Sequence, residues 1–246
     1  NPNAVGARVR SLLAFGREHP YGRPSQGFPS TVESITREDV ARHWQERVKP
    51  GSSVLVFVGG LTLDEATKLA EKHFGPWAGG ASPEIAIGPP QMAAAGRIYL
   101  VDRQDAAQTV VTQFLNAPAI GHADDDALTL ADSVYGGGGF GTRLNLNLRE
   151  DKGYSYGAFS SLVQFTDGGI WYGGGGVQTD KTAESVAEFV KELKGLAGER
   201  PIAADELESS RLRRLRGTSQ EYEAYANVGG KIAALWLQKR PLSELQ

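Results

Sequence analysis

Apolar and polar residues recur along this chain with two different periods, which indicates that helices and strands are mixed. Apolar positions return every three or four residues, as amphipathic helices require, in five stretches: 5–18, 36–48, 62–74, 124–135 and 179–193. A longer helical pattern runs from Pro201 toward Lys239 and is interrupted by Gly217 and by Gly229-Gly230. Two of these helices also carry N-terminal caps, since Thr36 and Asp39 have capping-box spacing and Thr62 begins the third stretch.

Runs of β-branched and aromatic residues predict the strands. The segment SSVLVFVGG, residues 52–60, has the pattern of a buried strand, and residues 97–103 and 109–117 predict two more. Residues 157–166 and 170–179 flank Asp167-Gly168-Gly169, a strong hairpin turn. Because hairpin strands are antiparallel and helices are also present, the predicted fold class is α+β with a mixed or antiparallel sheet.

A segment rich in Gly and Pro, residues 75–96, separates two regions that each contain strands and helices. Such composition is typical of linkers. The predicted organisation is one domain over residues 1–80, a linker over 81–96 and a second domain over 97–246.

Composition excludes several classes of function. The net charge is −3, so there is no basic surplus that would favour nucleic acid as a partner. The absence of cysteine excludes disulfides, thiolate metal sites and cysteine nucleophiles. No apolar run approaches the roughly 20 residues of a membrane-spanning helix.

Glycines are concentrated between Tyr135 and Tyr156, in the segment YGGGGFGTRLNLNLREDKGYSY. Glycine backbone adopts positive φ and lies close to another chain without steric cost. The sequence therefore predicts that an extended peptide substrate contacts this segment, at Gly136, Gly137, Gly138, Gly139 and Phe140.

A dinucleotide site is the competing hypothesis, because Gly136, Gly138 and Gly141 match G-x-G-x-x-G. That motif needs a preceding strand and an acidic residue about 20 positions later. Here a helical pattern precedes the glycines and the later region is Phe159-Ser160-Ser161-Leu162. The P-loop pattern fails as well, because Thr142-Arg143 stands where Lys-Ser/Thr is required.

Arg149 and Tyr156 are seven residues apart across a predicted turn at Gly153. A guanidinium and a phenol directed to one place can hold a backbone carbonyl or stabilise a developing oxyanion. The alternative is a surface arginine paired with Glu150 or Asp151 and a tyrosine packed on the sheet. Spacing alone leaves both interpretations open.

A metal site is not predicted in this chain. Zinc usually needs three or four well-placed ligands, and no two of the four histidines have helical or hairpin spacing: His19, His43, His73 and His122. A serine nucleophile is not predicted either, since G-x-S-x-G does not occur.

The segment around Arg149 is similar to the signature GG-x-F-x-[ST]-R-L-x-x-x-L-R-E-x-x-G-[YL]-x-Y of the M16 zinc peptidases, the insulinase, pitrilysin and mitochondrial processing peptidase group. The matching positions are Gly138-Gly139-Phe140-Gly141-Thr142-Arg143-Leu144, Leu148-Arg149-Glu150, Gly153 and Tyr156. Three earlier segments resemble the later half of an M16 first domain: residues 19–44, KPGSSVLVFVGGL and FGPW. The segment IYLVDRQDAAQTVV resembles the entry to the next domain.

The resemblance implies a two-layer α/β sandwich of the LuxS and mitochondrial processing peptidase type, with helices on one face of the sheet. Consecutive domains of this kind close around an unfolded peptide, which can add to an edge strand. In the family, one domain holds zinc through H-x-x-E-H and a distant Glu. The facing domain supplies an Arg/Tyr pair that orients the substrate, and Arg149 and Tyr156 occupy those two positions.

The sequence departs from the family pattern because it contains no H-x-x-E-H. It resembles the later half of one domain followed by most of the Arg/Tyr domain, without the closing strand. Alone it is expected to be inactive, with zinc held elsewhere in the complete enzyme or by a partner. The expected partners are an unfolded peptide, an H-x-x-E-H-bearing domain or subunit and, alternatively, a second copy of this chain.

The alternative function is a non-catalytic M16-like subunit that binds or scaffolds. The absence of cysteine and the bacterial character of the resemblance favour the periplasm or cell envelope as the location.

Overall fold

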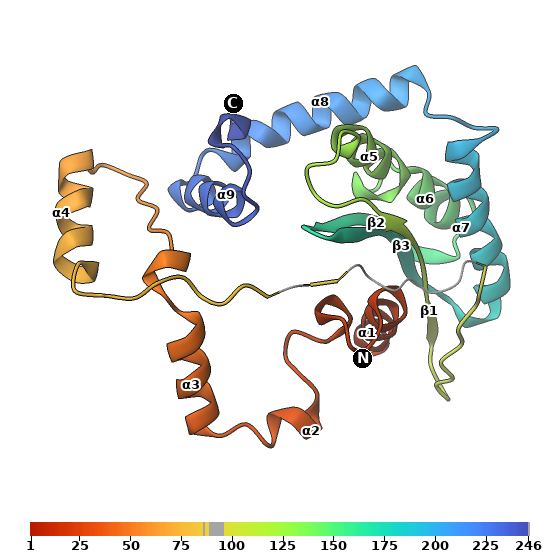
Figure 1. The fold of residues 1–246 in the computed structure, drawn as a ribbon. Coiled ribbons are helices and arrows are strands. Elements are labelled where there is room, and N and C mark those ends of the chain that lie inside the picture. Colours follow the sequence, from red (N-terminus) through yellow and green to blue (C-terminus); the bar gives the residue numbers. More distant parts are fainter. Residues whose placement is uncertain (86, 89–95, 246) are drawn as a thin grey trace. The chain divides into compact units, whose positions relative to one another are not determined.

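The computed structural model describes residues 1–85, 87–88 and 96–245. The chain divides into two compact units, each built from two segments (Figure 1). Unit 1 contains Asn1–Ser25 and Ile87–Arg213, and unit 2 contains Gln26–Ala86 and Arg214–Gln246. These units differ from the sequence-based domains 1–80 and 97–246, which stay a prediction. Of the predicted linker 81–96, residues 86 and 89–95 lie outside the described residues.

Unit 1 contains the sheet and most of the helices that cover it. Its strands and helices are α1 (Pro2–Phe15), β1 (Gln108–Ala117), α5 (Asp125–Asp132), α6 (Arg143–Asn145), β2 (Ser155–Phe165), β3 (Gly168–Gln178), α7 (Thr182–Ala197) and the first part of α8 (Ala204–Glu221). Two π-helical segments, η3 (Ser133–Gly137) and η4 (Leu146–Asp151), continue α5 and α6, and short 3₁₀ turns η1 (Pro20–Gly22) and η5 (Thr179–Lys181) follow α1 and precede α7.

The sheet is antiparallel with the strand order β1-β3-β2. The hairpin predicted around Asp167-Gly168-Gly169 is confirmed, because β2 pairs with β3 and Phe165 lies opposite Gly168. Gly168 has φ 138°, a conformation that a side chain disfavours. The α+β fold class is therefore confirmed.

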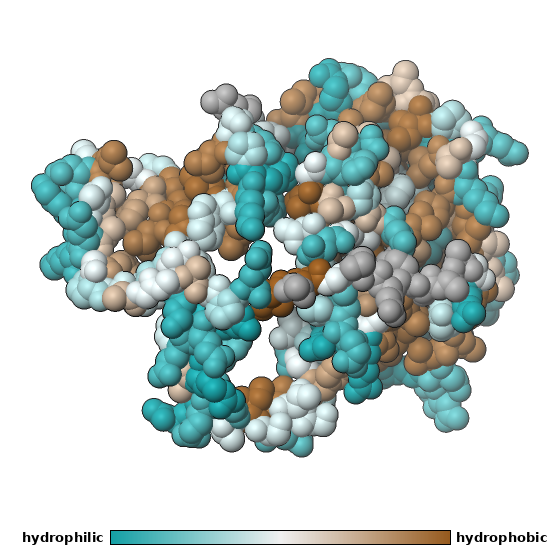
Figure 2. All heavy atoms as spheres, viewed as in Figure 1, coloured by the Kyte–Doolittle hydropathy of each residue, from teal (hydrophilic) through white to brown (hydrophobic). Residues whose placement is uncertain are grey.

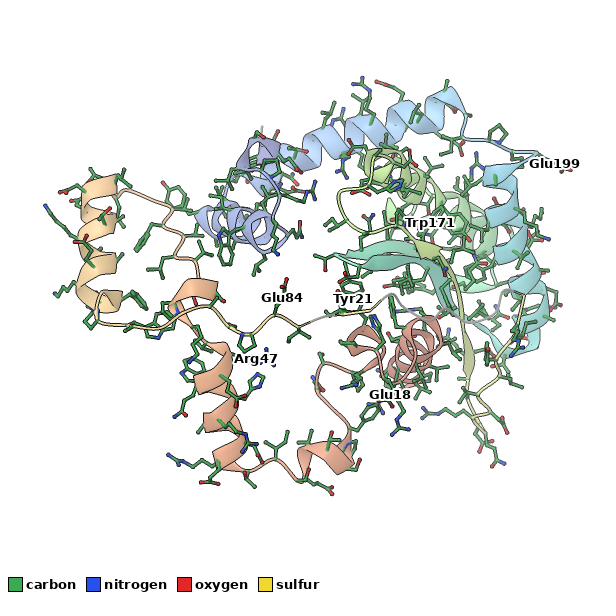
Figure 3. The ribbon with its side chains drawn as sticks, in the orientation of Figure 1. Glu18, Tyr21, Arg47, Glu84, Trp171 and Glu199 are labelled. Atoms are coloured by element: carbon green, nitrogen blue, oxygen red, sulfur yellow. The ribbon has the colours of Figure 1, made fainter. Side chains whose placement is uncertain are left out.

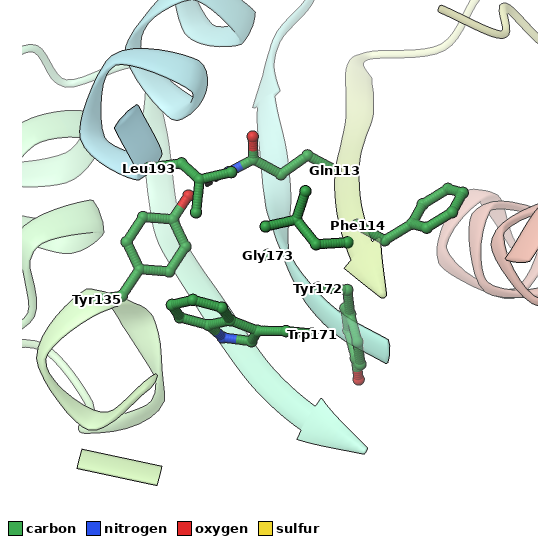
Figure 4. A pocket seen from close by; sticks show the side chains of 8 residues that line it. Gln113, Phe114, Tyr135, Trp171, Tyr172, Gly173 and Leu193 are labelled. Atoms are coloured by element: carbon green, nitrogen blue, oxygen red, sulfur yellow. Dashed lines mark hydrogen bonds between the residues drawn. The ribbon is translucent and has the colours of Figure 1, made fainter. Parts of the chain in front are cut away.

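One face of the sheet packs against α6, η3, η4 and α7 around a buried apolar cluster: Tyr135, Leu144, Leu148, Ala158, Val177 and Phe189. The hydroxyl of Tyr135 donates to the carbonyl of Phe189 over 3.3 Å. It also accepts a hydrogen bond from Gln113 (Figure 4). Burial raises the pKa of the Tyr135 phenol above its ordinary value. Beside these residues lies a small partly open pocket that Trp171 and Leu193 also line.

The opposite face of the sheet is covered in part by α1, so unit 1 has helices on both faces. Ala14 and Phe15, at the end of α1, form a second buried cluster with Ile170 of β3. Tyr21, which Figure 3 labels, stacks on Phe165 with ring centroids 3.8 Å apart. The prediction placed helices on one face only, because the resemblance assigned residues 1–80 to another domain. In the structure, apolar side chains on the second face of the sheet pack against α1.

Unit 2 contains α2 (Pro29–Val32), α3 (Arg37–Arg47), α4 (Leu63–Phe74), the end of α8 and α9 (Tyr225–Leu237), with 3₁₀ turns η2 (Pro50–Ser52) and η6 (Leu242–Leu245). The two predicted caps are confirmed as full capping boxes, Thr36 with Asp39 and Thr62 with Glu65. Several large apolar side chains of this unit are exposed, including Trp44, Leu61 and Leu63. Figure 2 shows hydrophobic residues, in brown, on the surface of the molecule.

Two predicted strands are wrong. Residues 52–60 and 97–103 are not strands, and the apolar side chains that predicted them are largely exposed, with Leu55 at 46% and Leu100 at 86%. The physical reason is that a strand exists only when another strand pairs with it. Among the described residues, the ladder contains only β1, β2 and β3.

The long helical pattern after Pro201 breaks at residues 222–224 rather than at its glycines. Gly217 lies inside α8, and Gly229 and Gly230 lie inside α9. A Cβ at Gly229 would come within 3.4 Å of the side chain of Val58. That distance is an ordinary van der Waals contact, and neither Gly229 nor Gly230 ends a helix.

None of the helices in the described residues is long and apolar enough to span a membrane.

Replacing Phe189 with alanine tests the core of unit 1. Phe189 is 1% exposed, so Phe189→Ala leaves a cavity and should lower the free energy of unfolding by about 3–5 kcal/mol. Urea denaturation followed by circular dichroism measures the change. The matched control on the same helix is Val190→Ala, a partly exposed site expected to change the free energy far less. Equal losses in the two variants would contradict this assignment of the core.

Candidate substrate-binding site

The glycine segment begins as the end of a helix, because Gly136 and Gly137 belong to η3. The expected helix before the glycines is thus present, and the strand that a dinucleotide motif requires is not. Gly136 is buried, and a Cβ there would lie 2.6 Å from the amide nitrogen of Ser160. A Cβ at Gly138 would lie 2.4 Å from the carbonyl oxygen of Ser133. Close packing within the chain therefore accounts for the first and third glycines.

Only Gly139 of the four consecutive glycines has positive φ, at 88°. It turns the chain away from η3 toward Thr142, and nothing lies within 4 Å of the position that its Cβ would take. Gly139 and the following Phe140 are exposed. The predicted contact between substrate and residues 136–140 stays a prediction, and Gly139 and Phe140 are accessible to such a contact.

Asn145 joins the glycine turn to strand β2, and sequence analysis missed it. Its buried amide nitrogen donates to the carbonyl oxygens of Gly139 and Ala158, over 3.0 and 2.7 Å, and to the hydroxyl of Thr142. Its amide oxygen accepts from the amide of Ala158 over 2.9 Å. The signal in the sequence was weak, because one asparagine between two leucines on a short helix has no distinctive pattern.

Arg143 is a structural residue although it belongs to the glycine-rich signature. Its side chain is 6% exposed and forms a fork-like ion pair with Glu206, at the start of α8. It also donates to the carbonyl oxygens of Arg200 and Pro201, over 2.6 and 2.9 Å. The hydrogen bond from Arg143 holds the pKa of Glu206 below its ordinary value, and the same bond raises the pKa of Arg143.

The π-helical segment η4 carries Arg149 and is anchored on both sides. Leu148 is fully buried in the core, and Asn147 donates to Glu188 and Glu192 of α7, over 2.7 Å each. The segment ends at Asp151, and Gly153, with a φ of 65°, turns the chain into β2. The predicted turn at Gly153 is therefore confirmed.

The structure places Arg149, Phe140 and Tyr156 together. The guanidinium carbon of Arg149 lies 4.3 Å from the ring centroid of Phe140 and 5.5 Å from that of Tyr156. Arg149 also approaches Glu150, with 3.3 Å between charged atoms. Tyr156 is 80% exposed, and its hydroxyl forms no hydrogen bond to any part of the chain that the structure describes. The guanidinium and the phenol are thus adjacent, on a surface that a peptide can reach.

The histidines and carboxylates that the structure describes do not form a zinc site. In the described residues, no three His, Cys, Asp or Glu side chains gather closely enough to hold a metal ion. His19 packs against Phe15 and has its Nε2 atom 2.9 Å from the carbonyl oxygen of Gly88. His43 and His73 are exposed on α3 and α4.

The ion pair between Arg143 and Glu206 should make stability depend on pH. Because Arg143 depresses the folded-state pKa of Glu206, the pair contributes fully above the unfolded value of 4.5 and is lost as pH falls through the folded value. Glu206→Gln should lower the free energy of unfolding at pH 7 by about 1–3 kcal/mol and flatten its decline below pH 4.5. Urea titrations between pH 7 and pH 3 measure both effects.

The matched control is Glu208→Gln on the same helix, where the pair with Arg211 is half exposed. In this variant the free energy of unfolding should still decline steeply below pH 4.5, because the pair of Arg143 and Glu206 is intact. If the free energy of unfolding of Glu206→Gln falls with pH as steeply as that of the unmodified protein, the pair with Arg143 does not make stability depend on pH.

Comparisons with known proteins identify the family and the fold. The family model described as "Peptidase M16 inactive domain" matches residues 34–213. An uncharacterised zinc protease of Mycobacterium tuberculosis is 31% identical over 160 residues, which cover 64% of this chain and 36% of that protein. One of Bacillus subtilis is 26% identical over 213 residues, covering 85% of this chain and 49% of its own. The chain thus spans about a third to a half of the length of these relatives.

Solved structures show the same fold. The crystal structure of a peptidase M16 inactive domain from Pseudomonas fluorescens aligns with a TM-score of 0.87 at 23% identity, over 100% of this chain and 57% of that one. A protease from Helicobacter pylori aligns with a TM-score of 0.78, over 96% of this chain and 60% of that one. The match of the family model covers well over half of the sequence, and the chain therefore belongs to the peptidase M16 inactive-domain family.

Proposed function

We propose that this chain is the substrate-binding portion of an M16-type zinc metallopeptidase that degrades or processes unfolded peptides. The observation that carries the proposal is the group of Arg149, Tyr156 and Phe140, in which the guanidinium carbon lies 5.5 Å from the ring centroid of the exposed Tyr156. A guanidinium and a phenol at this separation can donate to one backbone carbonyl. They can donate to the same oxygen when it becomes an oxyanion.

The surroundings of Arg149 favour binding with little reorganisation. The ring of Phe140 contacts the guanidinium, a cation–π interaction of about 0.5–1 kcal/mol at an exposed site. Leu148 and Asn147 fix the helical segment on which Arg149 stands. Side chains that are already held lose less conformational entropy when the substrate arrives. Glu150 competes only weakly with the substrate for the Arg149 guanidinium, because an exposed ion pair contributes little free energy.

Hydrolysis needs a group that this chain does not supply. The relatives from Mycobacterium and Bacillus are named zinc proteases, and the described residues offer no set of zinc ligands. Zinc bound by H-x-x-E-H, in another part of the protein or on a partner subunit, would supply an activated water. In that assembly Arg149 and Tyr156 hold and orient the peptide. Placement in the periplasm or cell envelope stays a prediction.

A non-catalytic binding or scaffold subunit is the second candidate. The description of the matching family as an inactive domain favours it, and the same donor pair would bind peptide without cleavage. The amino-acid sequence that neighbours this chain would distinguish the two candidate functions. An intact H-x-x-E-H there supports the first, and a degenerate motif with an active partner encoded alongside supports the second.

Substitution of the donor pair tests the proposal. In the assembled enzyme, Arg149→Ala or Tyr156→Phe should lower turnover of an unstructured fluorogenic peptide by about 10²-fold, the loss typical of one positioned donor to an oxyanion. Zinc content, measured by atomic absorption, should not change, because neither an arginine nor this tyrosine is proposed to bind the metal, which His and Glu side chains would hold. This chain without its H-x-x-E-H partner should not cleave the peptide.

The matched controls are Arg211→Ala and Tyr225→Phe, which alter exposed residues of the same types elsewhere. Both should retain full turnover. Zinc loss in the Arg149 or Tyr156 variants, or unchanged turnover, would refute the proposed role. Cleavage by the chain alone would show that its own histidines form a metal site.

A further inference from the structure

Strand β2 contains a β-bulge at Tyr156. Ser155 lies opposite Val177 of β3 and Ala158 lies opposite Gly175, so β2 advances three residues where β3 advances two. One strand therefore contains one extra residue, which is the definition of a bulge. Beyond Ala158 the register is regular to the hairpin turn.

The bulge decides which way Tyr156 points. Paired residues of antiparallel strands share a face, and so do residues two apart on one strand. Ser155 and Ala158 are therefore both on the core face, with Val177. In a regular strand Tyr156 would lie on the same face as Ala158 and enter the core. With the extra residue it is exposed, like Phe159, and lies near Arg149.

The hydroxyl of Ser155 holds this bulge closed. Its single hydrogen can be donated to the carbonyl oxygen of Gly176 or of Gly157, which lie 2.7 and 2.9 Å away, and its oxygen accepts from the amide of Gly157 at 3.1 Å. A bulge interrupts the ladder and leaves backbone groups without a strand partner. Ser155 is 7% exposed, so water does not readily replace its hydroxyl in this role.

From this geometry we infer that Ser155 is a positioning residue for substrate binding: its hydroxyl closes the bulge that directs Tyr156 toward Arg149 and the peptide. This inference rests on the proposed function of Tyr156. It goes beyond that proposal because Ser155 is buried on the opposite face of the strand and does not itself touch a peptide on the Tyr156 side.

The first test is independent of activity and uses this chain alone. In Ser155→Ala, NMR should show faster hydrogen exchange at the amide of Gly157, which loses its acceptor. The ring-current shift that Tyr156 imposes on the Arg149 guanidinium should also decrease. The matched control is Ser160→Ala, which alters an equally buried serine of β2 that bonds Asp132 away from the bulge. It should leave both signals unchanged. Unchanged signals in Ser155→Ala would overturn the inference.

The second test measures turnover in the assembled enzyme. Ser155→Ala should lower kcat by up to about 10²-fold, the effect of displacing a reacting group by about 1 Å. In a Tyr156→Phe background the same change should have almost no further effect, because the donor it positions is already absent. Ser155→Thr keeps a hydroxyl and should restore much of the activity. Independent, multiplying losses in the double variant would overturn the inference.

The two tests distinguish failure of this inference from failure of the proposed function. If Ser155→Ala moves Tyr156 by NMR but turnover is unchanged, the bulge acts as inferred and the substrate role of Tyr156 is refuted. Should Ser155→Ala fail to fold, Ser155→Cys keeps the volume of the side chain with a weaker hydrogen-bonding group. It is then expected to show the same two NMR changes in a folded protein.

Discussion

The buried amide of Asn145 is the interaction on which the candidate site depends. It saturates its hydrogen-bonding groups between the turn at Gly139 and the strand at Ala158, and so couples a helical segment to the sheet. A buried amide that lost these partners would leave several backbone groups unsatisfied, each at a cost of about 1–3 kcal/mol. That penalty keeps the turn with Phe140 and the strand with Tyr156 in one arrangement.

Arg149 and Tyr156 come from different kinds of backbone, and each is directed by a local irregularity. A π-helical segment anchored by Leu148 presents the arginine, and a bulged strand presents the tyrosine. Irregularities of this kind are common at functional sites because they re-aim a side chain that regular geometry would bury. The cation–π contacts to Phe140 and Tyr156 then keep the guanidinium close to both rings.

Local signals predicted the helices and the hairpin well, because their causes are local. Capping boxes at Thr36 and Thr62 satisfy the first amides of their helices from within four residues. The turn at Gly168 needs a positive φ, which glycine adopts readily, and the glycine is visible in the sequence. The segments 52–60 and 97–103 were mispredicted because strand formation depends on a distant partner, and residue pattern alone does not supply one.

The sequence by itself determined the family, the fold class and the turn at Gly153, and it singled out Arg149 and Tyr156 as candidates, because a motif and a hydrophobic period are properties of neighbouring positions. Only the tertiary structure decided the hydrogen-bond partners of Asn145, Arg143 and Ser155, which lie up to 63 residues away. It also showed that Gly136 and Gly138 are required by packing against Ser160 and Ser133. The face on which Tyr156 lies followed from one extra residue in a strand register, and register is fixed by pairing between strands rather than by the residues of either one.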